Sequence, residues 1–252
     1  APLMSLRFAG YSMIISEYTV LASINQDITI ALIADLHDRP FEPIKQAFSH
    51  CKPDIIAIPG DLINGSTTDS VNGLAFLQYA ASIAPTFYSL GNHEWRFDAD
   101  DILAICKTGA IPLDNAAVQF KDINIGGLST GFRGVIAQGN LKKTPMPDTR
   151  WLDEFSRIKG YKLLLSHHPE YYDEYIKPLP IALTLAGHAH GGQIRLFGRG
   201  LFAPGQGVFP KYTSGVYDNR LVVSRGLSNT AKLIPRLWNS PELVYITLQG
   251  RR

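Results

Sequence analysis

The chain lacks the features of a disulfide-rich or membrane-spanning protein. Only two of its 252 residues are cysteines, Cys51 and Cys106. Two thiols do not form a disulfide framework in a chain with this much core, so we expect both to be buried and inert. No stretch reaches the roughly 18 consecutive apolar residues of a spanning helix, which predicts a soluble chain. Because it begins at Ala1-Pro2 without Met, a cytoplasmic location and one dependent on a removed leader or membrane anchor both stay open.

The sequence also lacks a strong charge of either sign. Its 24 lysines and arginines nearly balance its 22 acidic residues, giving a formal charge of +2. This balance argues against a strongly basic nucleic-acid binder and against an acidic tail protein, so we expect no specific nucleic-acid partner. With 45% apolar and 18% charged residues, the chain has the composition of a globular protein. We expect one domain over residues 1–252.

Several catalytic motifs are missing. The sequence contains no GxSxG block, no P-loop and no cysteine in a catalytic context. Such patterns would supply a protein nucleophile or a phosphate-binding loop. The sequence therefore does not indicate a reaction through a covalent protein intermediate.

What the chain does contain is an alternation of strands and helices that later gives way to strands. Apolar runs without alternation, as in residues 28–34, predict strands buried on both faces. Strands are predicted at 13–15, 18–21, 28–34, 54–58, 86–90, 117–120, 123–126, 161–165, 181–185, 221–223 and 243–248, and helices at 41–51, 70–84 and 99–106. Residues 131–148 and 197–212 are predicted loops. This order predicts an α/β fold.

Polar side chains of the metal-binding type follow five of the predicted strands. The five blocks are Asp35-Leu36-His37, Gly60-Asp61, Gly91-Asn92-His93-Glu94, Ser166-His167-His168-Pro169 and Gly187-His188-Ala189-His190. Six of the seven histidines fall in these blocks, and only His50 does not. Because functional sites of open α/β sheets lie beyond the carboxyl ends of the strands, we expect the blocks to converge.

The residue types in these blocks indicate a metal site. Imidazole and carboxylate ligands without thiolates suit Mn, Fe or Zn in a catalytic site better than a structural zinc. The blocks hold too many candidate ligands for one tetrahedral ion, so two ions that share a bridging carboxylate are expected.

In this order the five blocks resemble the calcineurin-like metallophosphoesterase superfamily. The later run GHAHGGQIRLFGRGLFAPG, followed by Val223-Ser224-Arg225-Gly226 and Pro241-Glu242, is similar to a bacterial branch of membrane-associated phosphodiesterases and lipid A-precursor pyrophosphatases. The resemblance implies a four-layer α/β/β/α sandwich, with two mixed sheets flanked by helices. It also implies hydrolysis of phosphate esters, most readily diesters, by a hydroxide that bridges two metal ions.

The resemblance further implies a role for each matching residue. Asp35, His37 and His190 would hold one ion, Asn92, His167 and His188 the other, and Asp61 would bridge both. His93 would stabilise the phosphate or protonate the leaving oxygen. Many members read GDxxD, with the second Asp supporting this histidine, whereas this chain has Asn64 at that position. An amide supports an imidazolium less well than a carboxylate does, and Asp38 is the alternative supporting residue.

Several alternatives stay open at this level. A phosphomonoesterase or a nuclease could use the same centre, and a scaffold that has lost its metals is the non-enzyme alternative. The expected partner is a small phosphate ester, whether nucleotide-linked or lipid-linked. Arg39 and Arg133 are candidate phosphate ligands, and His168 is expected outside the ligand set. The aromatic and apolar residues Phe197, Leu201, Phe202, Phe209 and Tyr212 either contact a lipid or membrane or, as we favour, cover the edge of the second sheet.

Overall fold

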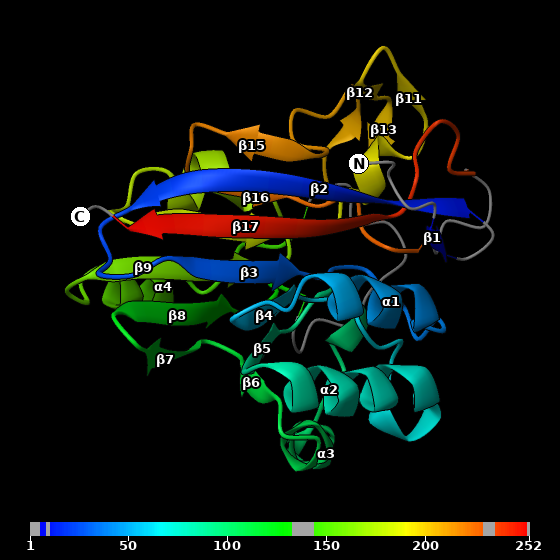
Figure 1. Ribbon diagram of the computed structural model, residues 1–252. Coiled ribbons are helices and arrows are strands. Elements are labelled where there is room, and N and C mark those ends of the chain that lie inside the picture. Colours follow the sequence, from blue (N-terminus) through cyan, green and yellow to red (C-terminus); the bar gives the residue numbers. More distant parts are fainter. Residues whose placement is uncertain (1–5, 9–10, 133–143, 229–234, 251–252) are drawn as a thin grey trace.

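A computed structural model describes residues 6–8, 11–132, 144–228 and 235–250. Seven strands form the first sheet in the order β1-β2-β17-β3-β4-β5-β6. Their bounds are Leu6–Phe8 (β1), Tyr11–Ala22 (β2), Glu242–Gly250 (β17), Ile28–Leu32 (β3), Ile55–Pro59 (β4), Thr86–Ser89 (β5) and Ile111–Leu113 (β6). Strands β3, β4, β5 and β6 are parallel, so their carboxyl ends lie along one edge of the sheet (Figure 1).

Six strands form the second sheet in the order β15-β16-β10-β9-β8-β7. Their bounds are Gly215–Tyr217 (β15), Leu221–Val223 (β16), Leu183–Ala186 (β10), Tyr161–Ser166 (β9), Ile123–Leu128 (β8) and Ala116–Phe120 (β7). The central strands β8, β9, β10 and β16 are again parallel. Two small hairpins follow β10, one from Arg195–Leu196 (β11) and Arg199–Gly200 (β12), the other from Phe202–Ala203 (β13) and Gly207–Val208 (β14).

Alternate residues of the strands enter different layers of the core. In β3, Ile30 and Leu32 face the second sheet, whereas Ala31 faces the helices. In β9, Leu163 and Leu165 face the first sheet, whereas Leu164 packs on the opposite side. These two strands therefore bury both faces, which explains why their apolar residues form unbroken runs. The expected four-layer α/β/β/α arrangement is confirmed.

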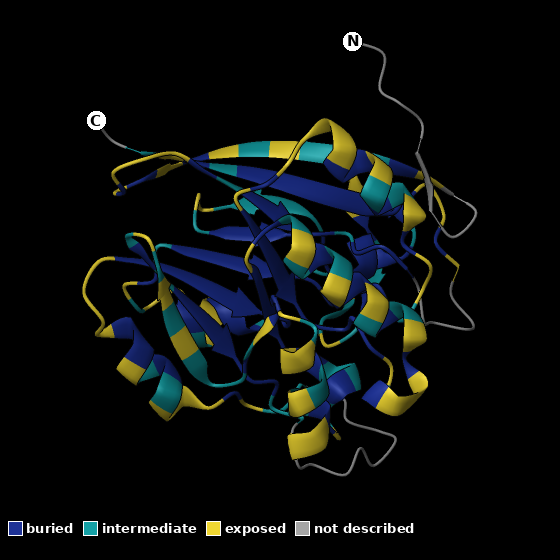
Figure 2. Cartoon of the chain, turned by 60° about the horizontal axis from the view of Figure 1, so that its bottom comes forward, coloured by how far each residue is buried: buried dark blue, intermediate teal, exposed yellow. Residues whose placement is uncertain are grey.

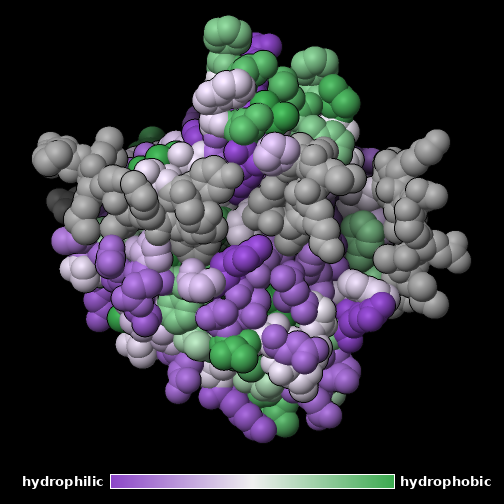
Figure 3. All heavy atoms as spheres, turned by 90° about the vertical axis from the view of Figure 1, so that its right-hand side faces the viewer, coloured by the Kyte–Doolittle hydropathy of each residue, from purple (hydrophilic) through white to green (hydrophobic). Residues whose placement is uncertain are grey.

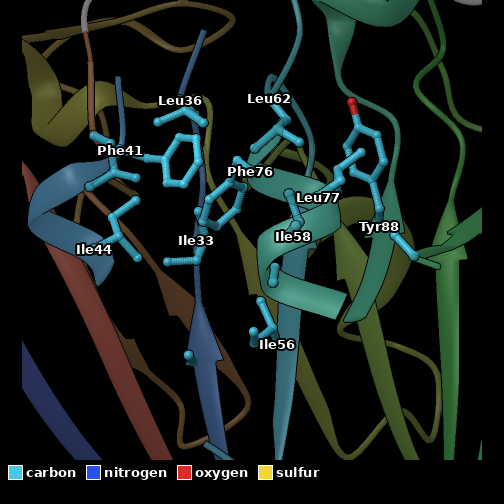
Figure 4. Packing of buried hydrophobic residues seen from close by; sticks show 14 of the residues in the cluster. Ile33, Leu36, Phe41, Ile44, Ile56, Ile58, Leu62, Phe76, Leu77 and Tyr88 are labelled. Carbon is cyan, nitrogen blue, oxygen red and sulfur yellow. The ribbon is translucent and has the colours of Figure 1, made fainter. Parts of the chain in front are cut away.

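The helices cover the outer faces of the sheets. Three helices pack on the first sheet: Glu42–His50 (α1), Val71–Ile83 (α2) and Ala99–Lys107 (α3). The fourth, Thr149–Ser156 (α4), packs on the second sheet. Figure 4 shows Ile44 of α1 and Phe76 of α2 directed toward Ile33 and Ile58 of the strands. In Figure 2 the helices expose their outer faces while the strands between them are buried. None of the described helices is long and apolar enough to cross a membrane.

Local chemistry sets where two of the helices begin. The Asp98 side chain accepts hydrogen bonds from the backbone N–H groups of Asp100 and Asp101 and so caps α3. Asp148 caps α4 in the same way by accepting from the N–H of Trp151. Pro43 occupies the first turn of α1, as the sequence predicts.

The structure differs from the sequence predictions in several places. Helix α4 and the short strands β1, β6 and β15 were not expected, and the predicted loop over residues 197–212 contains strands β12, β13 and β14. Both cysteines are exposed, so the prediction of buried thiols is wrong. Cys51 follows the last residue of α1, and Cys106 is rotated away from its buried neighbour Ile105 on α3.

Candidate metal centre

The five predicted blocks lie beyond the carboxyl ends of β3, β4, β5, β9 and β10, and the folded chain brings their side chains together. Three groups made up entirely of residues from these blocks have potential ligand atoms within 4.8 Å of one another: Asp35, His37 and His190; His37, Asp61 and His93; and Asp61, His167 and His188. The first and last groups together hold six of the seven candidate ligands. Asn92 joins the last group, because its Oδ1 lies 3.1 Å from Nε2 of His167.

Asp61 lies at the centre of the cluster. Its Oδ2 is 3.2 Å from Nε2 of His167 on one side and 3.8 Å from Nε2 of His37 on the other. The side chain is 1% exposed. Its carboxylate is thus the group that both halves of the cluster share.

A neighbouring group directs the ring of each candidate histidine ligand. Nδ1 of His37 lies 3.0 Å from Oδ1 of Asn64, that of His167 is 2.8 Å from the Pro59 carbonyl, and that of His190 is 3.0 Å from the Ser228 carbonyl. His188 has the opposite orientation, with Nδ1 turned toward Nε2 of His167 at 3.1 Å. In His37, His167 and His190 the other nitrogen, Nε2, therefore faces the cluster, whereas in His188 it is Nδ1 that faces the cluster and Nε2 lies 3.7 Å from Glu170.

The backbone that carries these side chains is strained. Positive φ angles between 45° and 65°, which residues other than glycine seldom adopt, occur at Asp35, His37, Asp61, His188 and His190. At Gly60, with φ of 95°, an added Cβ would lie 2.6 Å from the Cα of Gly91 and 2.8 Å from Nδ1 of His167. Such strain persists where surrounding structure enforces it, and it is most often found at functional sites.

Glu94 holds two of the loops together, a role that sequence reasoning missed. Its fully buried carboxylate accepts hydrogen bonds from the backbone N–H groups of Asp61 (3.0 Å) and Gly91 (2.6 Å), and from the Tyr88 hydroxyl (2.7 Å). Its position in the Gly91-Asn92-His93-Glu94 block was the available signal.

A second carboxylate lies behind His188 and was also missed. Oε1 of Glu170 is 3.7 Å from Nε2 of His188 and 3.3 Å from Nδ1 of His168. It also accepts a hydrogen bond of 2.5 Å from the Thr144 hydroxyl. His168 is fully buried, and its ring centroid lies 4.4 Å from that of His188. His168 and Glu170 thus form a layer behind the cluster.

The two proposed supports for His93 have other contacts. Asn64 binds His37 through both Nδ1 of the ring and, at 3.2 Å, the backbone carbonyl. Asp38 accepts a hydrogen bond of 2.7 Å from the N–H of Gly73 at the start of α2. Both candidate supports of His93 are thus engaged with other groups among the described residues. His93 instead lies beside Asp61, 3.9 Å from Oδ2, with its side chain 32% exposed.

The electrostatics of the cluster favour a bound cation. Burial lowers the pKa of His37 to about 4 and that of His190 to about 3, and it lowers the pKa of His188 as well, so these rings are neutral at pH 7. Burial alone would raise the pKa of Asp61, but His167 and His93 more than offset it and hold that carboxyl ionised. Neutral rings at His37, His188 and His190 and an ionised Asp61 are the protonation states that a metal ion requires, whereas the pKa of His167 is raised to about 10, so an ion would have to displace a proton there.

One buried nitrogen of the cluster lacks a partner that a metal ion would supply. Nε2 of His37 is buried and has no hydrogen-bond partner in the part of the chain that the structure describes. It faces Asp61 instead, and a buried polar atom without a partner is costly unless something else binds it. A divalent ion that takes nitrogen and oxygen ligands would satisfy it.

The candidate phosphate ligands and the candidate apolar wall do not form compact groups among the described residues. Arg39 is exposed, and Arg133 lies outside the described residues. Of the proposed apolar wall, Tyr212 is buried, Leu201 and Phe202 are half-buried, and Phe197 and Phe209 are exposed. Of this set only Tyr212 belongs to the buried cluster that contains Leu221 and Val223 of the second sheet.

The chain is similar in sequence to several metallophosphoesterases. Metallophosphoesterase YkuE of Bacillus subtilis is 37% identical over 211 residues, which cover 79% of this chain and 69% of that protein. Phosphodiesterase YaeI of Escherichia coli is 30% identical over 237 residues, covering 87% and 81%. A metallophosphoesterase of Campylobacter jejuni is 28% identical over 92% of this chain, which spans 62% of that relative's length.

Comparison of structures agrees at the level of the fold. A dimetal phosphatase from Danio rerio superimposes with a TM-score of 0.52 over 79% of this chain and 88% of its own, at 14% identity. The sequence model of the calcineurin-like phosphoesterases matches residues 28–192, a range that contains all five blocks. This chain belongs to the calcineurin-like phosphoesterase family.

Proposed function

We propose that the chain hydrolyses small phosphodiesters at a centre of two divalent metal ions, with Mn, Fe and Zn as the candidates. Asp35, His37 and His190 would hold one ion, Asn92, His167 and His188 the other, and Asp61 would bridge them. The proposal rests above all on Asp61, whose Oδ2 lies between His167 and His37. The phosphodiesterase name of the E. coli relative supports a diester as substrate.

The residues of the site divide the work of the reaction. Bound divalent ions would neutralise phosphate charge and make water a better nucleophile at neutral pH. The anchored imidazoles fix the ligand geometry, so little reorganisation is needed when the substrate arrives. His93 is the one imidazole of the cluster exposed enough to meet the substrate, and it would donate a hydrogen bond or a proton to the leaving oxygen.

Replacing Asp61 tests the centre. We expect Asp61→Asn to lose one or both metal ions, as measured by elemental analysis, and to lower hydrolysis of an aryl phosphodiester by roughly a hundredfold or more. Glu154→Gln, which removes an exposed carboxylate on α4, is the matched control and should keep metal and activity. Full metal content and full turnover in the Asp61→Asn protein would refute the centre.

A substrate panel separates the diesterase from its alternatives. Purified protein loaded with Mn, Fe or Zn would be assayed on an aryl diester, an aryl monoester and single-stranded DNA. We expect the highest kcat/KM on the diester. Faster hydrolysis of the monoester would assign a phosphomonoesterase to the same centre, and efficient cleavage of DNA would assign a nuclease, for which the formal charge of +2 gives no support.

A further inference from the structure

The exposed apolar side chains gather on the two small hairpins and the segment beside them. Among the described residues, six of the twelve exposed large hydrophobic side chains lie there: Leu196, Phe197, Val208, Phe209, Leu237 and Trp238. We call these six residues the hairpin surface. Figure 3 shows green side chains on the part that projects at the top, where Figure 1 places β11, β12 and β13.

The hairpin surface is continuous. Leu196, Phe197 and Trp238 line a cavity of about 410 Å³ together with Arg195 and Arg225. A neighbouring cavity of about 370 Å³ is lined by Phe209 and Arg199. Gly198 belongs to the walls of both cavities, so the aromatic residues of the two hairpins and Trp238 form one surface.

The backbone adopts an unfavourable conformation at the three largest of these side chains, which point outward. Phe197, Phe209 and Trp238 have φ of 49°, 54° and 52°, yet their side chains are 104%, 79% and 75% exposed. Left-handed turns are usually made by glycine or asparagine, because bulky residues are disfavoured there. A strained conformation that buries nothing within the chain indicates that the aromatic side chains contact something outside it.

The charge of this region is of one sign. Residues 190–217 include Arg195, Arg199 and Lys211 but no aspartate or glutamate. Lys211 pairs with Asp173 at 2.6 Å, and Nε of Arg225 lies 3.7 Å from Glu242. Arg199 is exposed and has no ion pair with a described carboxylate. Its charge is therefore available to an anionic surface.

The hairpins are firmly tied to the candidate metal centre. Arg195 is buried, and its guanidinium donates hydrogen bonds to the carbonyl of Gly191, 2.8 Å away, and to the carbonyl of Gly198 at the hairpin tip. Gly191 directly follows the candidate ligand His190. Because these hydrogen bonds fix the hairpins to the segment that carries His190, a binding partner on the hairpin surface would be held at a fixed position relative to the candidate metal centre.

We propose that the hairpin surface docks onto a phospholipid bilayer that carries anionic headgroups. Phe197, Phe209 and Trp238 enter the interfacial region, where aromatic side chains are favoured, and Arg199 lies among the headgroup phosphates. A bilayer suits this surface better than a protein partner does, because projecting aromatic tips enter fluid lipid without needing a complementary shape. Docking does not depend on the proposed reaction, so each can fail without the other.

Vesicle flotation tests the docking. Wild-type protein should float with vesicles of phosphatidylcholine mixed with phosphatidylglycerol and less with phosphatidylcholine alone. The double variant Phe197→Asn/Phe209→Asn should bind the mixed vesicles roughly tenfold more weakly or worse, and Arg199→Gln should lose the preference for phosphatidylglycerol. Because Asn adopts positive φ readily, the double variant should keep or raise the Tm.

Two further measurements complete the test. The matched control Val71→Asn/Leu103→Asn removes two exposed apolar side chains from α2 and α3 and should float like wild type. In unmutated protein, brominated lipid in the mixed vesicles should quench tryptophan fluorescence, and Trp238→Phe should reduce this quenching. Wild-type protein that stays in solution, or a double variant that floats equally well, would overturn the proposal. A dimer that the double variant dissociates would assign the surface to a second copy instead.

Discussion

At the scale of single residues, the candidate metal ligands differ in what supports them. Carbonyl or amide oxygens hold Nδ1 of His37, His167 and His190, whereas His188 has the carboxylate of Glu170 near its second nitrogen. Burial would raise the pKa of Glu170, but His188 and the hydrogen bond from His168 lower it below its usual range. Glu170 is therefore ionised and increases the basicity of the His188 ring.

Removing the charge of Glu170 should weaken metal binding without emptying the ligand set. We expect Glu170→Gln to lower the affinity for a divalent ion about ten- to a hundredfold, the usual effect of losing such a support. Competition against a fluorescent chelator measures this without any assay of activity. Glu154→Gln serves as the control, and equal affinities in the two variants would exclude this role for Glu170.

His167 predicts how metal binding depends on pH. Burial would lower its pKa, but the carboxylates of Asp61, Asp35 and Glu94 raise it to about 10. In metal-free protein at neutral pH the His167 ring is therefore an imidazolium with a proton on each nitrogen. An incoming ion must displace one of these protons. Below pH 10 the affinity should then rise with pH, by about tenfold per unit at most.

Calorimetry in buffers of different ionisation enthalpy checks the proton release. We expect at least one proton per chain, that of His167, to be released near neutral pH, since the rings of His37 and His190 are already neutral there and burial raises the pKa of Asp35. Metal affinity that stays constant from roughly pH 6 to 8 would contradict the assignment of a protonated His167.

At the scale of elements, the sequence predicts best where a strand is long and its end is chemically distinctive. The run 28–34 and the Asp35-Leu36-His37 block were both readable, because an unbroken apolar strand is followed at once by metal-binding side chains. The hairpins β11–β12 and β13–β14 were not readable, since strands of two residues show no alternation. Helix α4 was not predicted, although its capping residue Asp148 and its buried residues Leu152 and Phe155 were signals in the sequence.

Supporting residues are harder to predict than ligands, for a physical reason. A ligand is recognisable because several side chains of one chemical type recur at strand ends. Glu94 and Glu170 act through hydrogen bonds and ion pairs that exist only after distant segments have met, such as the 3.0 Å bond from Asp61 N–H to Glu94. In the sequence each is one carboxylate among 22 acidic residues, most of which lie on the surface in any globular protein.

At the scale of the whole molecule, the candidate centre joins the two sheets. Asp35, Asp61 and Asn92 follow strands of the first sheet, whereas His167 and His188 follow strands of the second. The sheets are otherwise held together by the apolar layer between them. Ions bound by both groups of ligands would link the sheets, and the unfolded chain has no such preformed site.

Metal removal should therefore lower the thermal stability of the entire fold. An ion at a hundredfold excess over its Kd adds about 2.7 kcal/mol to the free energy of unfolding, which corresponds to a rise in Tm of roughly 5–10 °C for a chain of this size. Differential scanning calorimetry after chelation, and again after Mn is restored, measures the shift. The Tm of Asp61→Asn should respond much less to Mn than that of Glu154→Gln. A Tm that is the same with and without metal would mean that the ions, if bound, do not link the two sheets.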